Sequence, residues 1–310
     1  MTTTVEQLVE RLWPDRTVRI SRLTGGMTNA NFLADLGDEQ VVVRMPGKDT
    51  GLLGIDRHHE AQANRLAASI GVAPDVLIES EAEGYLVTRF LPGRALIPSE
   101  LAREPMLGEV ARTLRLVHGA GTIPVEFNPF DVVASYHDIA AGRGINEPFD
   151  YVSALSVIDQ ILVARPFKPT AFCHNDLLTE NFLYDNRLRI LDWEYAGMGD
   201  PYFDLASFSL THELSGSADE ALLTHYFGRC DAGSHAVLTL MKLVSELREA
   251  MWGVVQLAIS EIEIDFAEYS QRNVRRFERL LDEINVAELL ELASTANDPA
   301  VYPREVNLND

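Results

Sequence analysis

The stretch from His174 to Asn181, together with Asp192, carries the side chains with the clearest chemical meaning in this sequence. It reads His-Asn-Asp-Leu-Leu-Thr-Glu-Asn, and Asp192 follows within Leu-Asp-Trp-Glu. The carboxylate of Asp176 can orient an attacking hydroxyl and accept its proton late in a reaction. The oxygens of Asn181 and Asp192 are hard ligands that suit Mg²⁺. This order of side chains predicts a site for phosphoryl transfer, which needs positioned groups and neutralised charge more than covalent chemistry.

Two further polar residues are expected to support this segment rather than to react. His174 is interpreted as a structural residue that hydrogen-bonds backbone under the loop, because Asp176 already supplies the proton acceptor. Asp204 follows Asp-Pro-Tyr-Phe and is predicted to accept backbone N–H groups of the loop. The alternative for Asp204 is an acid in the first turn of a helix, where the helix dipole favours it.

The segment from Leu23 to Asn29, Leu-Thr-Gly-Gly-Met-Thr-Asn, could cover the phosphates of a nucleotide. Gly25 and Gly26 would let the backbone approach an anion closely. Thr28 and Asn29 could donate further hydrogen bonds to it. An ordinary hairpin turn explains the same residues equally well.

Arg44 is the candidate cation for these phosphates. It closes the apolar run 41–43, and its planar fork of donors suits phosphate oxygens. Glu60, on the helix expected next, could hold this guanidinium in an ion pair. The alternatives are a solvated arginine at a strand end and a surface glutamate with Arg57 as an exposed neighbour.

The N-terminal third must supply a sheet that positions these groups. Thr3 and Glu6 form a capping-box pattern, which predicts a first helix that ends near Pro14. Alternating and β-rich runs then predict five strands with one inserted amphipathic helix. The strands are expected at 18–20, 31–36, 40–45, 76–78 and 85–90, and the helix at 56–70.

Beyond Pro92-Gly93, a natural hinge, the sequence becomes mainly helical. Helices are expected at about 100–118, 151–163, 202–213, 218–228, 235–260 and 264–293, and a short hairpin at 182–184 and 188–191. The backbone near Thr88 to Leu91, with Phe90 between them, is expected to meet the adenine of a bound nucleotide.

The composition limits the class of protein. The 310 residues include 26 basic and 47 acidic side chains, and this net charge of −21 argues against a nucleic-acid-binding protein. No apolar run is long enough to span a bilayer, and the N-terminus lacks the pattern of a secretion signal, so a cytoplasmic protein is expected. Cys173 and Cys230 lack the spacing of a zinc site and are expected to be buried and reduced.

These motifs make the chain similar to bacterial choline/ethanolamine kinases, within the larger aminoglycoside-phosphotransferase group. The resemblance spans about residues 20–280 and rests on Gly25 to Asn29, Val43-Arg44, His174 to Asn181, Asp192 to Ala196, Asp204 to Ala206, Trp252 to Ser260 and Tyr269. It implies an α+β, two-lobed protein-kinase-like fold. The small antiparallel-sheet N-lobe would span residues 1–91 and the larger, mainly helical C-lobe residues 92–310. It also implies that ATP and Mg²⁺ bind.

The acceptor half matches this family less closely. Choline kinases enclose the trimethylammonium group with two tryptophans one helical turn apart; here Trp252 takes the later position and Glu249 the earlier. A carboxylate beside an indole suits a cation, especially one that donates hydrogen bonds. The alternative is a solvated Glu249 beside a Trp252 at the edge of the core. Tyr195 and Glu194 are further candidates for this pocket.

The sequence therefore predicts an ATP- and Mg²⁺-dependent phosphotransferase that acts on the hydroxyl of a small amino alcohol, with choline or ethanolamine as first choice. The same chemistry on an aminoglycoside, thiamine or a sugar is the nearest alternative, and a nucleotide-binding scaffold without turnover is another. A protein kinase is disfavoured, because only residues 193–200 separate Asp192 from the next helix. The oligomeric state stays open.

Overall fold

The computed structural model describes residues 3–23, 28–260 and 264–296. The chain divides into two compact units. The first unit comprises Met1–Ala95 and Glu180–Glu194, and the second unit comprises Leu96–Thr179 and Tyr195–Asp310. The lobe boundary expected after residue 91 stays a prediction. The expected N-lobe did not contain residues 180–194, which belong to the first unit.

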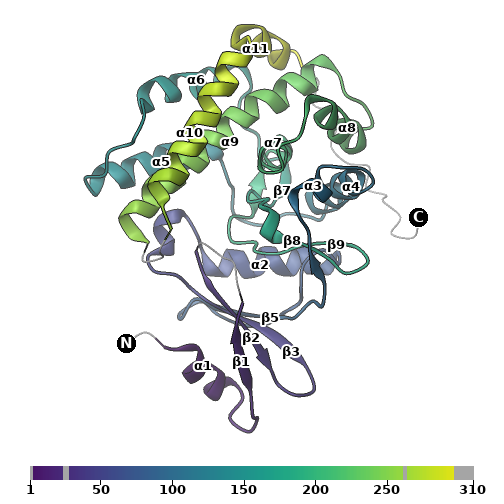
Figure 1. The fold of residues 1–310 in the computed structure, drawn as a ribbon, viewed down its shortest axis with the longest axis vertical. Helices are drawn as coiled ribbons and strands as arrows, with labels where there is room; N and C mark the ends of the chain where they lie inside the picture. The colour runs from purple at the N-terminus through teal and green to yellow at the C-terminus, as the bar shows by residue number, and fades with distance from the viewer. Residues whose placement is uncertain (1–2, 24–27, 261–263, 297–310) are drawn as a thin grey trace. The chain divides into compact units, whose positions relative to one another are not determined.

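The first unit is built on a five-stranded sheet (Figure 1). Its strands are β1 (Arg19–Arg22), β2 (Ala30–Asp35), β3 (Gln40–Met45), β4 (Val76–Ser80) and β5 (Tyr85–Arg89), in the spatial order β1-β2-β3-β5-β4. Neighbouring strands pair antiparallel throughout, and Val42 of β3 lies opposite Leu33 of β2 and Thr88 of β5. The five strands predicted from the sequence patterns and the antiparallel sheet implied by the family resemblance are thus confirmed.

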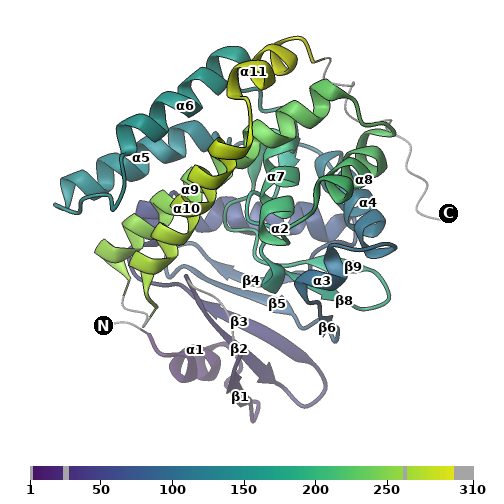
Figure 2. The same cartoon turned by 45° about the horizontal axis from the view of Figure 1, so that its top comes forward.

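Helix α1 (Val5–Leu12) packs against one face of this sheet, as Figure 2 shows from a second direction. Helix and sheet share one apolar core, formed by Val5, Leu8, Val9, Ala34, Leu36, Val41, Val43, Tyr85 and Val87. Because successive side chains of a strand point to opposite faces, Val42 and Arg44 lie on the other face of β3.

The cap of α1 lies one residue later than the sequence pattern indicated. The Thr4 hydroxyl accepts from the Gln7 amide at 3.3 Å, and the Gln7 side chain accepts from the Thr4 amide at 3.0 Å. The predicted pair of Thr3 and Glu6 is therefore wrong. Starting the helix at Val5 places its apolar stripe toward the sheet, and this packing decides between two adjacent threonines.

The segment 180–194 completes the first unit. The strands β8 (Phe182–Tyr184) and β9 (Leu188–Ile190) form the predicted hairpin, and β6 (Arg94–Ala95) pairs with β8. The Ile190 amide donates to the Val72 carbonyl at 3.1 Å, just after α2 (Arg57–Ser69). Backbone hydrogen bonds therefore join this hairpin to the N-terminal residues. Short 3₁₀ turns, η1 (Thr50–Leu53) and η2 (Thr179–Asn181), precede α2 and β8.

The second unit is mainly helical. It contains α3 (Pro98–Leu101), α4 (Met106–His118), α5 (Pro129–Gly142), α6 (Tyr151–Ala164), α7 (Pro201–Thr211), α8 (Gly216–Phe227), α9 (Ala232–Ile259), α10 (Phe266–Glu283) and α11 (Val286–Ser294). The strands β7 (Ala171–Cys173) and β10 (Gly197–Gly199) pair with each other. Helix α9 is the centre of this unit: it contacts α5, α7, α10 and α11, and its buried residues lie all around its circumference. A sheet in the first unit and helices in the second confirm the α+β class.

Several helix boundaries differ from those expected. The predicted helix 100–118 is divided into α3 and α4, and Pro105, which lacks an N–H, is the N-cap of α4. The predicted helix 264–293 is two helices, because Asn285 accepts from the Glu288 amide and caps α11. Helix α5 was not predicted. Cys173 is buried as expected, whereas Cys230 is partly exposed.

Among the helices of the described residues, none combines the length and the hydropathy needed to cross a bilayer.

Candidate active site

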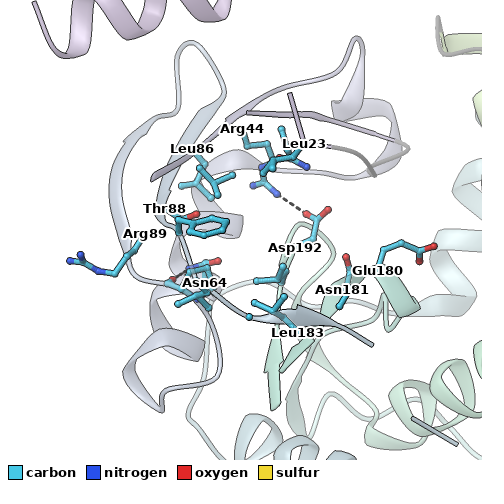
Figure 3. Close-up of a pocket in the computed structure, with 18 residues that line it drawn as sticks. Leu23, Arg44, Asn64, Leu86, Thr88, Arg89, Glu180, Asn181, Leu183 and Asp192 are labelled. Atoms are coloured by element: carbon cyan, nitrogen blue, oxygen red, sulfur yellow. Dashed lines mark hydrogen bonds and ion pairs between the residues drawn. The ribbon is translucent and has the colours of Figure 1, made fainter. Parts of the chain in front are cut away.

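A cavity of about 420 Å³ lies within the first unit, beside the face of β3 that carries Val42 and Arg44 (Figure 3). Much of its wall is apolar and includes Val42, Leu86, Phe90, Leu91, Leu183 and Leu191. Arg44, Asn181 and Asp192 are its polar residues with the chemistry predicted above, and Figure 3 shows Asp192 between the other two. An apolar wall with a few convergent polar groups is typical of a site for a small molecule.

Arg44 stands at the polar part of this cavity, held by two carboxylates. Its Nη1 donates to Asp192 Oδ1 at 2.6 Å, and its Nη2 contacts Glu60 of α2. The Arg44 side chain is 9% exposed and that of Glu60 is 2% exposed. The expected pair between Arg44 and Glu60 is therefore present, and neither alternative, a solvated arginine or a surface glutamate, holds.

Asp192 and Asn181 come to the same cavity from the two ends of the hairpin. The Leu191 amide donates to the Asn181 carbonyl at 2.9 Å, which keeps the two segments together. Asp192 has a φ of 64°, a left-handed conformation that Asp tolerates better than most residues. Neighbouring amide and carboxylate oxygens, with no histidine or cysteine among the described lining residues, fit Mg²⁺ as a ligand set.

Thr88 and Phe90 line this cavity where the chain leaves β5. The Phe90 amide donates to the Gln40 carbonyl at 3.1 Å, which fixes the segment beside β3. The apolar lining, which includes Leu86, Phe90 and Leu183, suits a flat base, and the guanidinium of Arg44 in the same cavity suits phosphate oxygens. The cavity therefore fits a nucleotide in size and in the order of its apolar and charged parts.

The segment expected to cover the phosphates is described only in part. Gly25 and Gly26 lie outside the described residues. Asn29 is 5% exposed, and its Nδ2 donates to Glu194 Oε2 at 2.7 Å. Thr28 lies close to Gly47, where an added Cβ would stand 2.0 Å from the Thr28 carbonyl oxygen. Neither Thr28 nor Asn29 is among the lining residues of the cavity. The contacts of Asn29 with Glu194 and Arg57 hold the described end of this loop in place.

Arg57 is a residue that the sequence interpretation missed. It was taken as an exposed neighbour of Glu60, but its side chain is only 12% exposed. Its Nη1 bonds Glu60 at 2.8 Å and Glu194 at 3.0 Å, and its Nη2 donates to Asn29 Oδ1 at 2.8 Å. The i,i+3 spacing of Arg57 and Glu60 was the available signal, since it places both on one helix face.

Glu194 belongs to this network, although it was predicted for the acceptor pocket. It is 7% exposed and bonds Asn29 and Arg57 within the first unit. Burial and the charge of Asp192 raise the pKa of Glu194, while Arg57 opposes the rise. These contacts indicate that Glu194 holds the loop that ends at Asn29, rather than an acceptor.

In the second unit, Asp204 braces the loop that carries Asp176, as predicted. Its carboxylate accepts from the His174 amide at 2.8 Å and from the Asn175 amide at 2.6 Å. Burial alone would raise the pKa of Asp204, but the hydrogen bond and charge of His118 hold it below its ordinary value. His118, whose Nε2 lies 2.9 Å from Asp204, was not predicted and offered no local sequence signal.

His174 is structural, in agreement with its interpretation. It is fully buried, and its Nδ1 accepts from the Asp176 amide at 3.3 Å. Asn175 has a φ of 65° and donates from Nδ2 to the Tyr195 carbonyl at 3.0 Å. These bonds fix the backbone on both sides of the point where the Asp176 side chain leaves the loop.

The predicted acceptor residues Tyr195, Glu249 and Trp252 come together in the second unit. Trp252 Nε1 donates to Tyr195 Oη at 2.9 Å, and the Trp252 ring lies 5.3 Å from that of Tyr269. The Tyr269 hydroxyl donates to Glu249 Oε2 at 2.5 Å. Glu249 is thus bonded inside an aromatic cluster, and the alternative of a solvated glutamate does not hold.

Arg248 is the second functional candidate that the sequence interpretation missed. Its guanidinium is buried, contacts Glu249, and lies 4.0 Å from Asp176 and 4.5 Å from the centre of the Tyr195 ring. An arginine on a helix that is buried all around gives no periodic signal, because every face of the helix appears equally apolar.

The structure thus groups the predicted residues in two sets. Arg44, Glu60, Thr88, Phe90, Asn181 and Asp192 lie together in the first unit, and Asp176, Tyr195, Glu249 and Trp252 in the second. The meeting of Asp176 with Asn181 and Asp192 around one phosphoryl group stays a prediction.

Comparisons with known proteins agree with this chemistry. A model described as the phosphotransferase enzyme family matches residues 19–237. A choline/ethanolamine kinase family protein from Mesorhizobium loti is 30% identical, with a TM-score of 0.76 over 92% of this chain and 95% of that chain. A structure of LicA in complex with AMP is 26% identical, with a TM-score of 0.73 over 92% and 96%. Ethanolamine kinase 1 of Mus musculus is 26% identical and covers 90% of this chain and 88% of its own length.

The family model covers more than half of the chain, and the likeness to the Mesorhizobium loti protein extends over nearly all of it. This likeness confirms the expected kinase-like, two-lobed fold class. The chain belongs to the phosphotransferase enzyme family and, within it, to the choline/ethanolamine kinase family.

Proposed function

We propose that the protein transfers the γ-phosphoryl group of ATP to the hydroxyl of a small amino alcohol, with ethanolamine or choline as the substrate. The observation that carries this proposal is the acceptor cluster, in which Asp176 and Glu249 lie against one guanidinium beside Trp252 and Tyr269. A carboxylate for the hydroxyl and a carboxylate with aromatic rings for the cation are the two groups that such a substrate requires.

In the proposed reaction the acceptor oxygen attacks the γ-phosphorus, and the bond from that phosphorus to the β,γ-bridging oxygen breaks. Asp176 orients the hydroxyl and receives its proton as the leaving oxygen departs. The product is a phosphate monoester of the amino alcohol, and ADP leaves. Asp204 keeps the loop in place through the two backbone amides that it accepts.

In the first unit, Arg44 would neutralise the phosphates, with Asp192 and Glu60 holding its guanidinium. Asn181 and Asp192 would hold Mg²⁺, which, when bound, neutralises charge that develops on the transferred group. The adenine would lie near Thr88 and Phe90. The relative with AMP bound supports a nucleotide in this role. We also propose a cytoplasmic location, with no nucleic-acid or membrane partner.

The test is a panel of hydroxyl acceptors offered to the purified protein with MgATP, with ADP release and the phosphorylated product both measured. Ethanolamine, choline, an aminoglycoside, thiamine and a hexose cover the alternatives. Turnover of an amino alcohol at a kcat/KM at least ~10²-fold above that of the other acceptors is expected. Preferred turnover of a sugar or an aminoglycoside would overturn the acceptor assignment. Binding of MgATP without turnover of any acceptor would favour a nucleotide-binding scaffold.

A further inference from the structure

The acceptor cluster contains a buried cation whose role the proposed reaction leaves open. The Arg248 side chain is 1% exposed, and an unpaired charge at such a position costs several kcal/mol. Burial lowers the pKa of Arg248, but Glu249, Tyr136, Tyr195 and Asp176 together raise it well above its ordinary value. The guanidinium is therefore charged, and its neighbours stabilise that charge.

One nitrogen of this guanidinium stands between the two carboxylates of the acceptor site. Nη1 contacts Glu249 Oε1 and lies 4.0 Å from Asp176 Oδ1. Without it, two carboxylates this close would repel each other. With it, the three groups carry a net charge of about −1 by simple counting of ionised forms, which one ammonium ion neutralises. The arrangement therefore suits a single cationic acceptor.

Aromatic contacts hold the guanidinium in one orientation. Its Cζ lies 4.5 Å from the centre of the Tyr195 ring and 5.8 Å from that of Phe127. Trp252 fixes Tyr195 by a hydrogen bond, and Tyr269 fixes the second oxygen of Glu249. Arg248 cannot swing away without breaking these packed contacts, so the positions of the two carboxylates are coupled.

Two donors of Arg248 lack an acceptor. Among the described residues, neither its Nε nor its Nη2 donates a hydrogen bond, and both nitrogens are buried. Buried N–H groups without acceptors are costly, so packing and the neighbouring carboxylates must hold the guanidinium in place.

We propose that Arg248 is a positioning residue that sets the distance between Glu249, which takes the ammonium end of the substrate, and Asp176, which takes its hydroxyl end. The site thereby selects an amino alcohol with two carbons between nitrogen and oxygen. This inference rests on the proposed function, because both ends belong to the same acceptor.

We expect this arrangement to make the site selective for the length of the substrate. Two carboxylates that share one guanidinium nitrogen are a few ångströms apart, which suits a two-carbon spacer with a hydrogen bond at each end. Each added methylene lengthens the ligand by roughly 1.3 Å along its axis. A misplacement of about 1 Å at a reacting group costs up to ~10²-fold in rate.

The experiment compares ethanolamine with 3-amino-1-propanol in the full-length wild type and in Arg248→Met and Arg248→Lys. The wild type is expected to prefer the two-carbon substrate by at least ~10-fold in kcat/KM. Arg248→Met is expected to reduce this preference to within about threefold, with the KM for ATP changed by less than about twofold. Arg248→Lys keeps the charge but not the planar fork, so its preference for ethanolamine is expected to lie between that of the wild type and that of Arg248→Met. Arg275→Met, which removes an exposed arginine of α10, is the matched control.

The pH dependence of kcat gives a second readout. Removal of the nearby positive charge disfavours the ionised form of a carboxylate, so the acidic limb of the Arg248→Met profile is expected at higher pH. The ionisable groups that interact with Asp176 and Arg248 here are Tyr136, Tyr195, Glu249 and Tyr269.

The outcomes distinguish a failure of the role of Arg248 from a failure of the proposed function. Loss of thermal stability in Arg248→Met with an unchanged length preference and acidic limb would make Arg248 merely structural and overturn the inference, while the proposed function stands. Should Arg248→Met fail to fold, an unchanged preference in Arg248→Lys would overturn it equally. A wild type that phosphorylates no amino alcohol would overturn the proposed function, and with it this inference.

Discussion

The backbone of the loop that carries Asp176 is fixed by hydrogen bonds, and this determines how a substitution of Asp176 would act. Its amide is bonded to His174 Nδ1, and the preceding amides are bonded to Asp204. None of these bonds involves the Asp176 carboxylate. A substitution of the Asp176 side chain therefore leaves these three backbone bonds available.

Asp176→Asn is expected to abolish most catalysis and to preserve nucleotide binding. The amide keeps the size of the side chain but cannot accept the hydroxyl proton, so kcat should fall by at least ~10²-fold. The Kd for MgATP, measured by calorimetry, should change by less than about threefold, because Asp176 is not among the residues that line the cavity proposed for the nucleotide. Near-wild-type turnover would show that Asp176 is not the base.

Glu246 on α9 is a buried carboxyl whose protonation should influence stability. Burial raises the pKa of Glu246 to about 7, although Arg276 lies 2.8 Å away and opposes the rise. The folded protein therefore holds this proton at a pH where the unfolded chain, with an ordinary pKa near 4.5, has released it. Stability from this group is complete below pH 4.5 and is lost as the pH rises toward 7.

Glu246→Gln is expected to remove that loss. The variant should gain stability relative to the wild type between pH 5 and pH 8, by roughly 1–3 kcal/mol in unfolding free energy at the upper end. Urea unfolding at several pH values measures this difference. Glu278→Gln, on the exposed side of α10, is the control for the change in net charge. A difference that is constant over this pH range would mean that Glu246 ionises normally.

At the scale of elements, the loop between β1 and β2 depends on a close approach by the backbone that follows β3. An added Cβ on Gly47 would stand 2.0 Å from the Thr28 carbonyl oxygen, a distance that no packed atoms can keep. A side chain at this position must therefore displace the C-terminal end of the segment expected to cover the phosphates.

Gly47→Ala is expected to raise the KM for ATP by about 10-fold or more, because a shift of about 1 Å in a positioning element has large kinetic effects. The KM for the acceptor should stay within about twofold of the wild type. Gly51→Ala is the matched control, since an added Cβ there meets nothing within 4 Å. Equal effects of the two substitutions would indicate a general loss of stability.

The elements show where sequence patterns suffice. The sheet of the first unit was predicted because Val18 and Ile20 alternate with Arg19 and Ser21, and because the β-rich runs that follow are short and separated by turn residues. Helix α5 was missed although its buried residues Phe130, Val133, Tyr136 and Ala140 follow a helical spacing. In α9, burial on all sides of the helix concealed Arg248, whose partners come from the distant positions 127, 176 and 195.

The residues of the candidate site could likewise be predicted where a local pattern marks them, and not where their partners are distant in the sequence. Asp176, Asn181 and Asp192 could be proposed because their types and spacing carry the chemistry by themselves, and their roles stay predictions. Asp204 was found because it follows a recognisable helix start. Arg57 was misjudged: its i,i+3 spacing to Glu60 was a local signal, but its bond to Glu194, at a separation of 137 positions, has none.

At the scale of the whole molecule, the net charge of −21 should affect the two substrates in opposite ways. The field attracts a cationic amino alcohol and repels the MgATP anion, and added salt screens both effects. The KM for ethanolamine is expected to rise about two- to fivefold between 20 and 500 mM salt, while that for MgATP falls or stays constant. Potassium acetate in place of NaCl controls for specific ions. A parallel rise of both KM values would contradict a field effect.

The membership of residues 180–194 in the first unit has a practical consequence for protein engineers. The chain passes between the units at three places, after positions 95, 179 and 194, so no single truncation separates them. A fragment ending at Ala95 would leave the Val72 carbonyl without the Ile190 amide and would omit both proposed metal ligands. A chimera that takes the helical unit from a relative must therefore keep this fifteen-residue insert from the host, because otherwise the first unit would combine segments of two different proteins.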